Sequence, residues 1–214
     1  MNCANCKKIA CLVGGKKTPP DCPMEKYPKI YKNARAIYNS PEVKKMALNA
    51  GIVEATGYIE WPRLKDTIEY ATLMDYKKIG LAFCIGLLKE AQKTQEILQN
   101  YGFEVFSILC KTGGFTKSEI GNLPEEFQMK SKTGYNIGFV SCNPVGQALL
   151  LNEIKTDFNI IVGLCVGHDT LFIKYSEAPV TVFIAKDRRL AHNPAAALYT
   201  FYSDQFFKRD QHIK

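Results

Sequence analysis

Apolar and polar residues follow one another along residues 78–185 in blocks whose lengths suit strands and helices in turn. Short continuous apolar runs bounded by charged residues are typical of parallel strands buried on both faces. Apolar positions spaced three or four residues apart between those runs indicate amphipathic helices. The pattern predicts strands at 78–84, 103–110, 159–165 and 180–185, and helices at 86–100, 145–154 and 169–175, the last capped by Asp169.

Strands and helices that alternate in this way predict an α/β fold with an open, mostly parallel sheet and helices on both faces. Two helices are expected before the sheet: one begins at Pro41 after the N-cap Ser40, and one covers 62–73. Asn193-Pro194 is expected to open a terminal helix that continues through Phe207. The predicted organisation is a segment 1–25, a helical lead-in 26–76 and a sheet from about residue 78, the last two forming one domain, 26–214.

One polar stretch, 111–135, shows little periodicity and contains several glycines. A loop of this length inside a compact domain is uncommon, and such loops tend to carry function. We therefore expect it to serve the functional site.

The first 25 residues have almost no apolar material for a core but contain four cysteines with the spacing C-x2-C-x4-C-x10-C: Cys3, Cys6, Cys11 and Cys22. Gly-Gly and Pro-Pro pairs between the last two cysteines let the chain fold back on itself. A segment of this kind becomes ordered when a metal ion holds it, since metal binding supplies on the order of 10 kcal/mol. The spacing predicts a small metal-binding knot.

The identity of the metal stays open between two alternatives. Zinc takes four thiolates, usually from two tight pairs, whereas only Cys3 and Cys6 form such a pair here. The Cys22-Pro23 dipeptide resembles the end of a ferredoxin cluster run, which favours a 4Fe-4S iron–sulfur cluster over zinc by a narrow margin.

The remaining four cysteines fall at the ends of predicted elements. Cys84, Cys110 and Cys165 each end a predicted strand, and Cys142 stands just before a predicted helix. The carboxyl ends of parallel strands form the ligand crevice of open α/β sheets, so these thiols are predicted to converge on a second metal site. The alternative is that each cysteine is simply a small buried apolar residue.

Polar residues follow the same strand ends. His168, Asp169, Lys111 and His192 are candidate catalytic residues, as general acids or contacts to an anionic substrate. Weaker candidates for binding a cofactor frame the same crevice: Asn143, Gln147 and Arg188. No phosphate-binding glycine fingerprint follows the first strand, so a dinucleotide is not indicated.

The cysteine usage and the N-terminus together predict a cytoplasmic protein. No signal peptide or membrane span is apparent, and in a reducing compartment eight cysteines indicate metal ligands or catalytic thiols. The formal charge is +7, but the lysines are scattered and form no basic stripe, so nucleic acid is not indicated as a partner.

Several long motifs resemble an uncharacterised metal-binding protein family of archaea and anaerobic bacteria. They include Cys3-Ala-Asn-Cys6, Gly80-Leu-Ala-Phe-Cys84, Cys142-Asn-Pro144, Gly163-Leu-Cys-Val-Gly-His-Asp169 and His192-Asn-Pro194, and the resemblance covers nearly the whole chain. It implies metal binding and an N-terminal cysteine cluster, with no assigned reaction. Membership in a family of anaerobic organisms favours an iron–sulfur cluster over zinc.

Two functional hypotheses follow. In the first, both cysteine sets hold iron–sulfur clusters, and the protein carries out redox or sulfur-handling chemistry with an electron-donor protein or a small-molecule substrate as partner. In the second, zinc holds the N-terminal knot, and the α/β domain binds a small ligand or delivers metal without catalysis. A third and weaker hypothesis pairs crevice thiols as a redox dithiol, although no CxxC occurs there.

Overall fold

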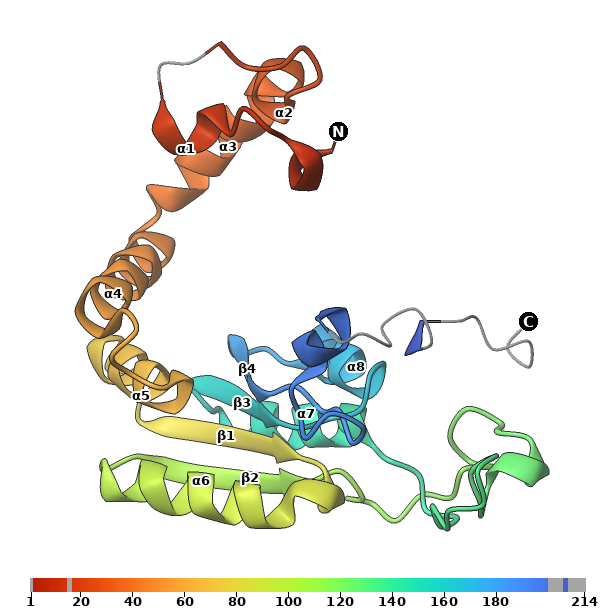
Figure 1. Cartoon of the computed structure of the whole chain (residues 1–214). Helices are drawn as coiled ribbons and strands as arrows, with labels where there is room; N and C mark the ends of the chain where they lie inside the picture. The colour runs from red at the N-terminus through yellow and green to blue at the C-terminus, as the bar shows by residue number, and fades with distance from the viewer. Residues whose placement is uncertain (1, 15–16, 200–205, 208–214) are drawn as a thin grey trace. The chain divides into compact units, whose positions relative to one another are not determined.

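The computed structural model describes residues 2–14, 17–199 and 206–207, which form two compact units, Met1–Glu60 and Trp61–Lys214. The first unit consists of helices (Figure 1), namely η1 (Cys3–Asn5), α1 (Ala10–Val13), α2 (Pro23–Lys26), α3 (Pro28–Tyr38) and α4 (Pro41–Gly57). A boundary at residue 25, as expected from the sequence, stays a prediction.

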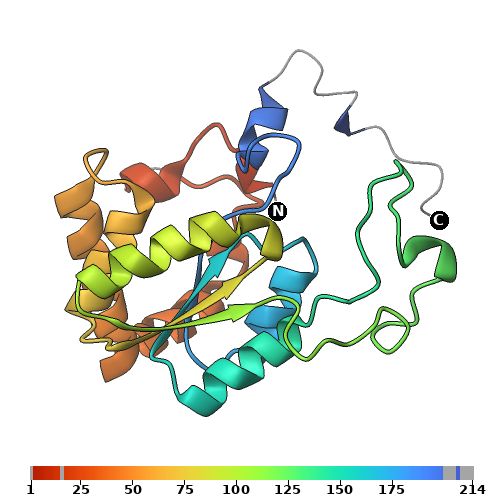
Figure 2. The ribbon, with the colours of Figure 1, turned by 90° about the horizontal axis from the view of Figure 1, so that it is seen from below.

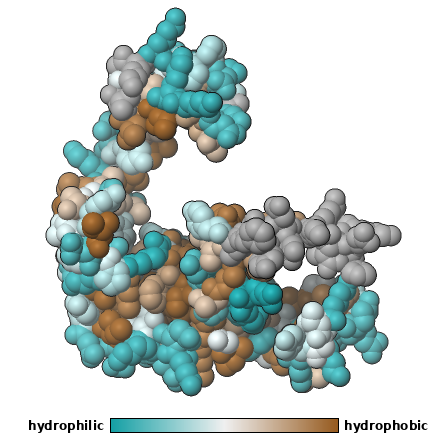
Figure 3. All heavy atoms as spheres, in the orientation of Figure 1, coloured by the Kyte–Doolittle hydropathy of each residue, from teal (hydrophilic) through white to brown (hydrophobic). Residues whose placement is uncertain are grey.

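The first unit buries very little. Among the side chains described in 2–26, Ala10 is the only buried one, and α3 contains no buried residue. Large apolar side chains are instead exposed, such as Ile30 at 60% and Ile37 at 61%, and Figure 3 shows apolar residues at the surface. Burial of apolar surface therefore does little to hold residues 2–26 in place.

Ser40 is the N-cap residue of α4, as predicted, and Pro41 is the first residue of the helix. The expected capping hydrogen bond is absent, because the Ser40 hydroxyl donates to the carbonyl of Ile37 at 2.8 Å, in the preceding turn. The Ser40 side chain thus bonds to the end of α3 and not to the first turn of α4.

The second unit is the predicted α/β domain. It contains α5 (Arg63–Leu73), β1 (Lys78–Phe83), η2 (Ile85–Leu87), α6 (Leu88–Asn100), β2 (Glu104–Leu109), η3 (Glu125–Phe127), α7 (Pro144–Ile154), β3 (Phe158–Val162), α8 (His168–Tyr175), β4 (Val180–Ile184) and η4 (Pro194–Leu198). The four strands are all parallel and lie in the order β2-β1-β3-β4. The open parallel sheet predicted from the sequence is confirmed.

The strand order determines which face each helix covers. The chain moves in one direction from β1 to β2 and in the other from β2 to β3 and β4. Because such crossovers are right-handed, α6 lies on one face of the sheet and α7 and α8 pack together on the other (Figures 1 and 2). β1 and β3 are buried between these layers, as their continuous apolar sequences predicted.

Two sequence predictions at the C-terminal side of this unit are wrong. α8 is capped by Gly167, and the Asp169 carboxylate accepts from its neighbour Thr170 N–H at 2.7 Å, inside the first turn. The predicted helix from Pro194 to Phe207 begins as a 3-10 helix that ends at Leu198, and 200–205 lie outside the described residues. No helix in the described part of the chain is long and apolar enough to cross a membrane.

A glycine in β1 makes room for a buried polar network beneath α7. The fully buried Asn159 of β3 accepts from the Thr156 hydroxyl and donates to the Ser176 hydroxyl, both at 2.8 Å. A Cβ at Gly80 would lie 2.1 Å from Asn159 Oδ1 and 2.7 Å from Leu151 Cδ1. Only glycine lets this polar group and α7 approach β1 so closely.

Gly80→Ala is therefore expected to destabilise the sheet unit by about 1–3 kcal/mol through overpacking. Asn159→Ala should cost about 1–3 kcal/mol, because it removes the buried hydrogen bonds to the Thr156 and Ser176 hydroxyls. The double variant should cost less than the sum of the two, since removal of the amide makes room for the new methyl group. Urea unfolding monitored by the fluorescence of Trp61, the single tryptophan, measures all three. Strictly additive costs would show that the glycine and the amide are not coupled.

Candidate functional site

Four thiols come together at the carboxyl edge of the sheet. The sulfurs of Cys110 and Cys142 lie 3.7 Å apart. Cys84 contacts the thiols of both Cys110 and Cys165, so the four sulfurs form a continuous chain of contacts, in the order Cys165, Cys84, Cys110 and Cys142. Cys84 and Cys110, in the middle of this series of sulfurs, are buried. Cys142 and Cys165, at its two ends, are half-buried.

The parallel ladder fixes two of these cysteines by their backbones. Cys84 N–H donates to Val162 O at 3.3 Å and Cys110 N–H donates to Phe83 O at 2.9 Å, which continues the strand pairing one residue past β1 and β2. The connections after β1 and β3 leave toward opposite faces of the sheet, and this reversal opens a crevice between the two strand ends. Cys84 and Cys165 follow those two strands.

Donors from the protein point at the buried sulfurs. The backbone N–H groups of Ile85 and Gly86 donate to Cys110 Sγ and Cys84 Sγ, each at 3.5 Å. The ammonium group of Lys186, two residues past β4, also contacts Cys84 Sγ. Lys186 is not among the residues predicted from the sequence, although its position just after the fourth strand was an available signal.

The contacts among the sulfurs divide them into two acidic and two weakly acidic groups. The thiols of Cys110 and Cys165, followed by Lys186 and the Gly86 N–H, lower the pKa of Cys84 against the effect of burial. Contact with Cys142 and Cys84 raises the pKa of Cys110, and contact with Cys84 raises the pKa of Cys165, in both cases aided by burial. Lowered and raised pKa values therefore alternate along the series of sulfurs from Cys142 to Cys165.

Cys142 is the acidic thiol at the outer end. The thiol of Cys110 and the neighbouring His168 lower its pKa to about 4, with a further electrostatic contribution from Lys111. The candidate residue His168 thus lies beside a cysteine. Lys111 also contributes through structure, because its ammonium donates to Val140 O at 2.7 Å.

Gln147 and Asn143 hold the backbone around the thiols. Gln147 is fully buried, and its Nε2 donates to Ile108 O at 2.6 Å and to Phe83 O at 3.3 Å, so it joins the last residues of β2 and β1. Its Oε1 has no hydrogen-bond partner among the described residues. Asn143 caps α7 by accepting from Gly146 N–H at 2.8 Å. A cofactor contact by either residue stays a prediction.

The long polar stretch leaves the sheet at Cys110 and returns at Cys142. Asn143 N–H donates to Cys110 O at 2.7 Å, and the Asn143 amide donates to Thr112 O at 3.2 Å, which closes the base of the excursion. Beyond the base, two isolated antiparallel bridges join Thr116 to Val140 and Lys130 to Asn136. The excursion is therefore anchored beside two of the thiols.

The remaining candidates after β4 differ in their surroundings. His192 accepts the Asp187 N–H on its Nδ1 at 3.1 Å, so this ring bonds within its own loop. The guanidinium of Arg188 lies near Gly86 and acts electrostatically on Cys165. Arg188 is thus close to the thiols, whereas His192 bonds within the loop after β4.

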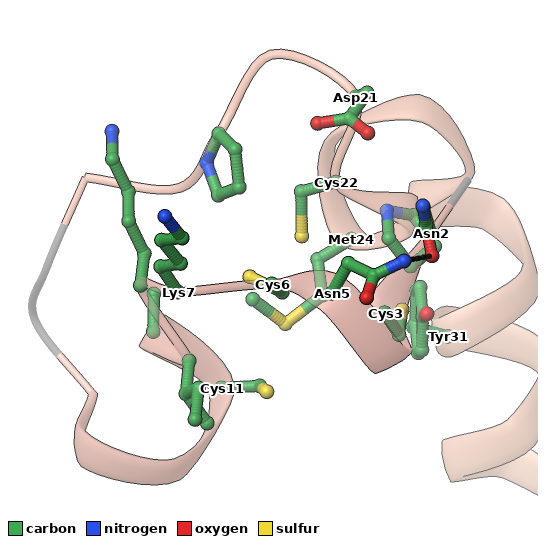
Figure 4. Close-up of a pocket in the computed structure, with 15 residues that line it drawn as sticks. Asn2, Cys3, Asn5, Cys6, Lys7, Cys11, Asp21, Cys22, Met24 and Tyr31 are labelled. Atoms are coloured by element: carbon green, nitrogen blue, oxygen red, sulfur yellow. Dashed lines mark hydrogen bonds between the residues drawn. The ribbon is translucent and has the colours of Figure 1, made fainter.

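The four N-terminal cysteines line one pocket of about 600 Å³ in the first unit. Figure 4 shows that Cys6 and Cys22 project into this pocket from different segments, and Cys11 enters it from α1. Cys6 N–H donates to Cys3 O at 3.1 Å, which forms the tight turn expected for this pair. Cys3 and Cys11 are exposed, and Cys6 and Cys22 are half-buried.

Cysteines that lie close together are not necessarily arranged to bind a metal ion. Within 2–14, 17–199 and 206–207, no group of three or more Cys, His, Asp or Glu side chains is arranged so that it could hold a metal ion. At the crevice the sulfurs contact one another in sequence rather than surrounding a common point.

The comparisons with known proteins agree with one another. A family model described as "Protein of unknown function (DUF1847)" matches residues 22–183. An uncharacterized protein of Methanocaldococcus jannaschii is 46% identical over 202 residues, which cover 94% of this chain and 95% of that protein. No solved structure matches the chain. The matched residues include all four crevice cysteines and begin at Cys22, the last of the N-terminal four.

The acidity of Cys142 can be measured in reduced, chelator-treated protein. With a pKa of about 4, Cys142 is a thiolate above that pH and becomes protonated as the pH falls through it. Its alkylation by iodoacetamide should therefore stay nearly constant from pH 8 to pH 5, whereas an ordinary thiol slows about tenfold per pH unit below its pKa of about 8.5. Peptide mass spectrometry measures the rate, and His168→Ala should move the midpoint upward. A midpoint near 8 in the unsubstituted protein would contradict the assignment.

Proposed function

Because this chain belongs to the DUF1847 family of proteins of unknown function, its membership brings no reaction with it, and we propose from its residues that it is a cysteine-ligated metal protein. The proposal has two sites: the crevice set Cys84, Cys110, Cys142 and Cys165, and the N-terminal set Cys3, Cys6, Cys11 and Cys22. Iron–sulfur clusters are the proposed cofactors. A cluster of this type supplies one-electron transfer or handles sulfur when bound.

The observation that carries the proposal is the meeting of four sulfurs with cations that have no carboxylate partner. Lys186 contacts Cys84, while Lys111 and His168 act on Cys142. Among the described residues, Lys186 and Lys111 form no ion pair with a carboxylate. Thiolates are the anions that balance these cations, and metal ligands must be thiolates.

The donor set also suits an iron–sulfur cluster. Burial and N–H groups directed at cysteine sulfur are among the features that set cluster reduction potentials. Both occur at the crevice, where Cys84 and Cys110 are buried and each accepts a backbone N–H. His168, beside Cys142, is the residue we propose to move protons at this edge of the sheet.

The N-terminal set is supported by a different argument. Ordering each residue costs about 1–2 kcal/mol of backbone entropy, and among the side chains described in 2–26 only Ala10 is buried to offset it. Ile9 in addition has a φ of 41°, a left-handed conformation that is strained for a β-branched residue. A metal held by the four thiols supplies the missing free energy.

Zinc at the crevice is the second candidate. Two ligands of a tetrahedral ion with zinc–sulfur bonds of about 2.3 Å lie about 3.8 Å apart. The 3.7 Å between Cys110 Sγ and Cys142 Sγ matches that spacing. In that case the domain would bind a ligand or deliver metal without redox chemistry.

Protein purified strictly without oxygen should be brown and contain iron and acid-labile sulfide in equal amounts, about eight of each per chain for two 4Fe-4S clusters. Cys84→Ser/Cys110→Ser should remove one half of the iron and Cys3→Ser/Cys6→Ser the other, because each pair belongs to a different site. Elemental analysis and the visible spectrum measure both effects.

A colourless anaerobic protein with one zinc would replace the iron–sulfur proposal by the zinc alternative. Full metal content in both double variants would overturn cysteine ligation altogether. Circular dichroism of each variant shows whether the α/β domain is still folded.

A further inference from the structure

The missing side chain of Gly86 leaves a small space at the edge of the crevice. A Cβ built there would lie 3.8 Å from Lys186 Nζ, 3.9 Å from a terminal nitrogen of Arg188 and 3.9 Å from Cys84 Sγ. Two cations and a thiol thus flank the open side of Gly86, which has no side chain to separate them. Gly86 and Arg188 are exposed, so a small solute can approach the two cations from solvent.

Neither cation is neutralised by a carboxylate. In the part of the chain that the structure describes, Lys186 and Arg188 form no ion pair. Asp187 stands between them in sequence, but its Oδ1 accepts the backbone N–H groups of Arg189 and Leu190 at 2.9 and 3.0 Å. Its carboxylate is therefore engaged in its own turn.

A count of the charges around the proposed metal centre also indicates a site for an anion. Four thiolates around a metal unit of charge +2 carry two negative charges in total. Lys111, Lys186 and Arg188 supply three positive charges next to the thiols. One positive charge therefore remains next to the thiols, and two of the three cations, Lys186 and Arg188, flank Gly86.

We propose that Gly86, Lys186 and Arg188 form a binding site for a small oxyanion beside Cys84. The ammonium and guanidinium groups would contact the oxygens, and the guanidinium can do so in a bidentate manner. The absence of a side chain at Gly86 leaves the room. This inference rests on the proposed function for its purpose, because it names the chemical class of the substrate, a small oxyanion, that would reach the thiol centre.

Gly86→Ala is the sharpest test, because it adds a methyl group next to both cations, where it would crowd a bound anion, and keeps both cations. The contacts of 3.8–3.9 Å are ordinary van der Waals distances, so the chain can accept this methyl group without strain. Arg188→Gln removes a cation and keeps a polar side chain. Arg189→Ala is the matched control, because the guanidinium of Arg189 faces the Phe206 ring, 5.8 Å from its centroid.

The experiment is isothermal titration calorimetry of the anaerobically purified full chain with sodium sulfate in sodium chloride of constant ionic strength, repeated with phosphate and acetate. The unsubstituted protein should bind at one saturable site. Gly86→Ala and Arg188→Gln should weaken binding at least tenfold, and Arg189→Ala should leave it unchanged. The metal content of each sample should stay the same.

Three results would overturn the inference: no saturable binding by the unsubstituted protein, equal binding by the Gly86→Ala and Arg188→Gln variants, or loss of metal by both variants. The last would mean that these residues support the metal centre itself. A metal-free protein that shows the expected binding pattern would refute the proposed function and leave the oxyanion site standing.

Discussion

All four strands of the sheet point the same way, and the crevice chemistry depends on this parallel order. Parallel strands end at one edge, so residues that follow β1, β2 and β3 meet there although they are far apart in sequence. The backbone bonds of Cys84 and Cys110 extend the ladder and hold two thiols at fixed positions. Gln147 then joins the two strand ends from α7. The thiols are close because the strands are parallel, and no local cysteine motif is required.

The sequence predicted this arrangement well for a physical reason. Continuous apolar runs mark parallel strands, and the residue after such a run must lie at the carboxyl edge. The positions of Cys84, Cys110 and Cys165 followed from that alone. Side-chain hydrogen bonds were less predictable, because a hydroxyl or carboxylate near a helix start has several partners within reach. The side chains of Ser40 and Asp169 each form a hydrogen bond other than the expected capping bond.

Other features depend on contacts that form only in the folded chain. The predicted terminal helix begins as a 3-10 helix at Pro194–Leu198, a difference in helix type that the Asn193-Pro194 signal does not specify. The network around Asn159 needs the space that Gly80 leaves in a different strand. The approach of Lys186 to Cys84 joins residues 102 positions apart. Metal binding, the cofactor and a reducing cellular location stay predictions.

The polar excursion between β2 and α7 has a consequence for how such a protein can diversify. Its base is fixed by the bond from Asn143 N–H to Cys110 O, and both thiols that flank it are held by the sheet and by α7. Insertions, deletions or exchanges farther out in this segment would therefore leave the sulfurs where they are. Evolution can alter the segment next to the thiols while the arrangement of the thiols stays the same.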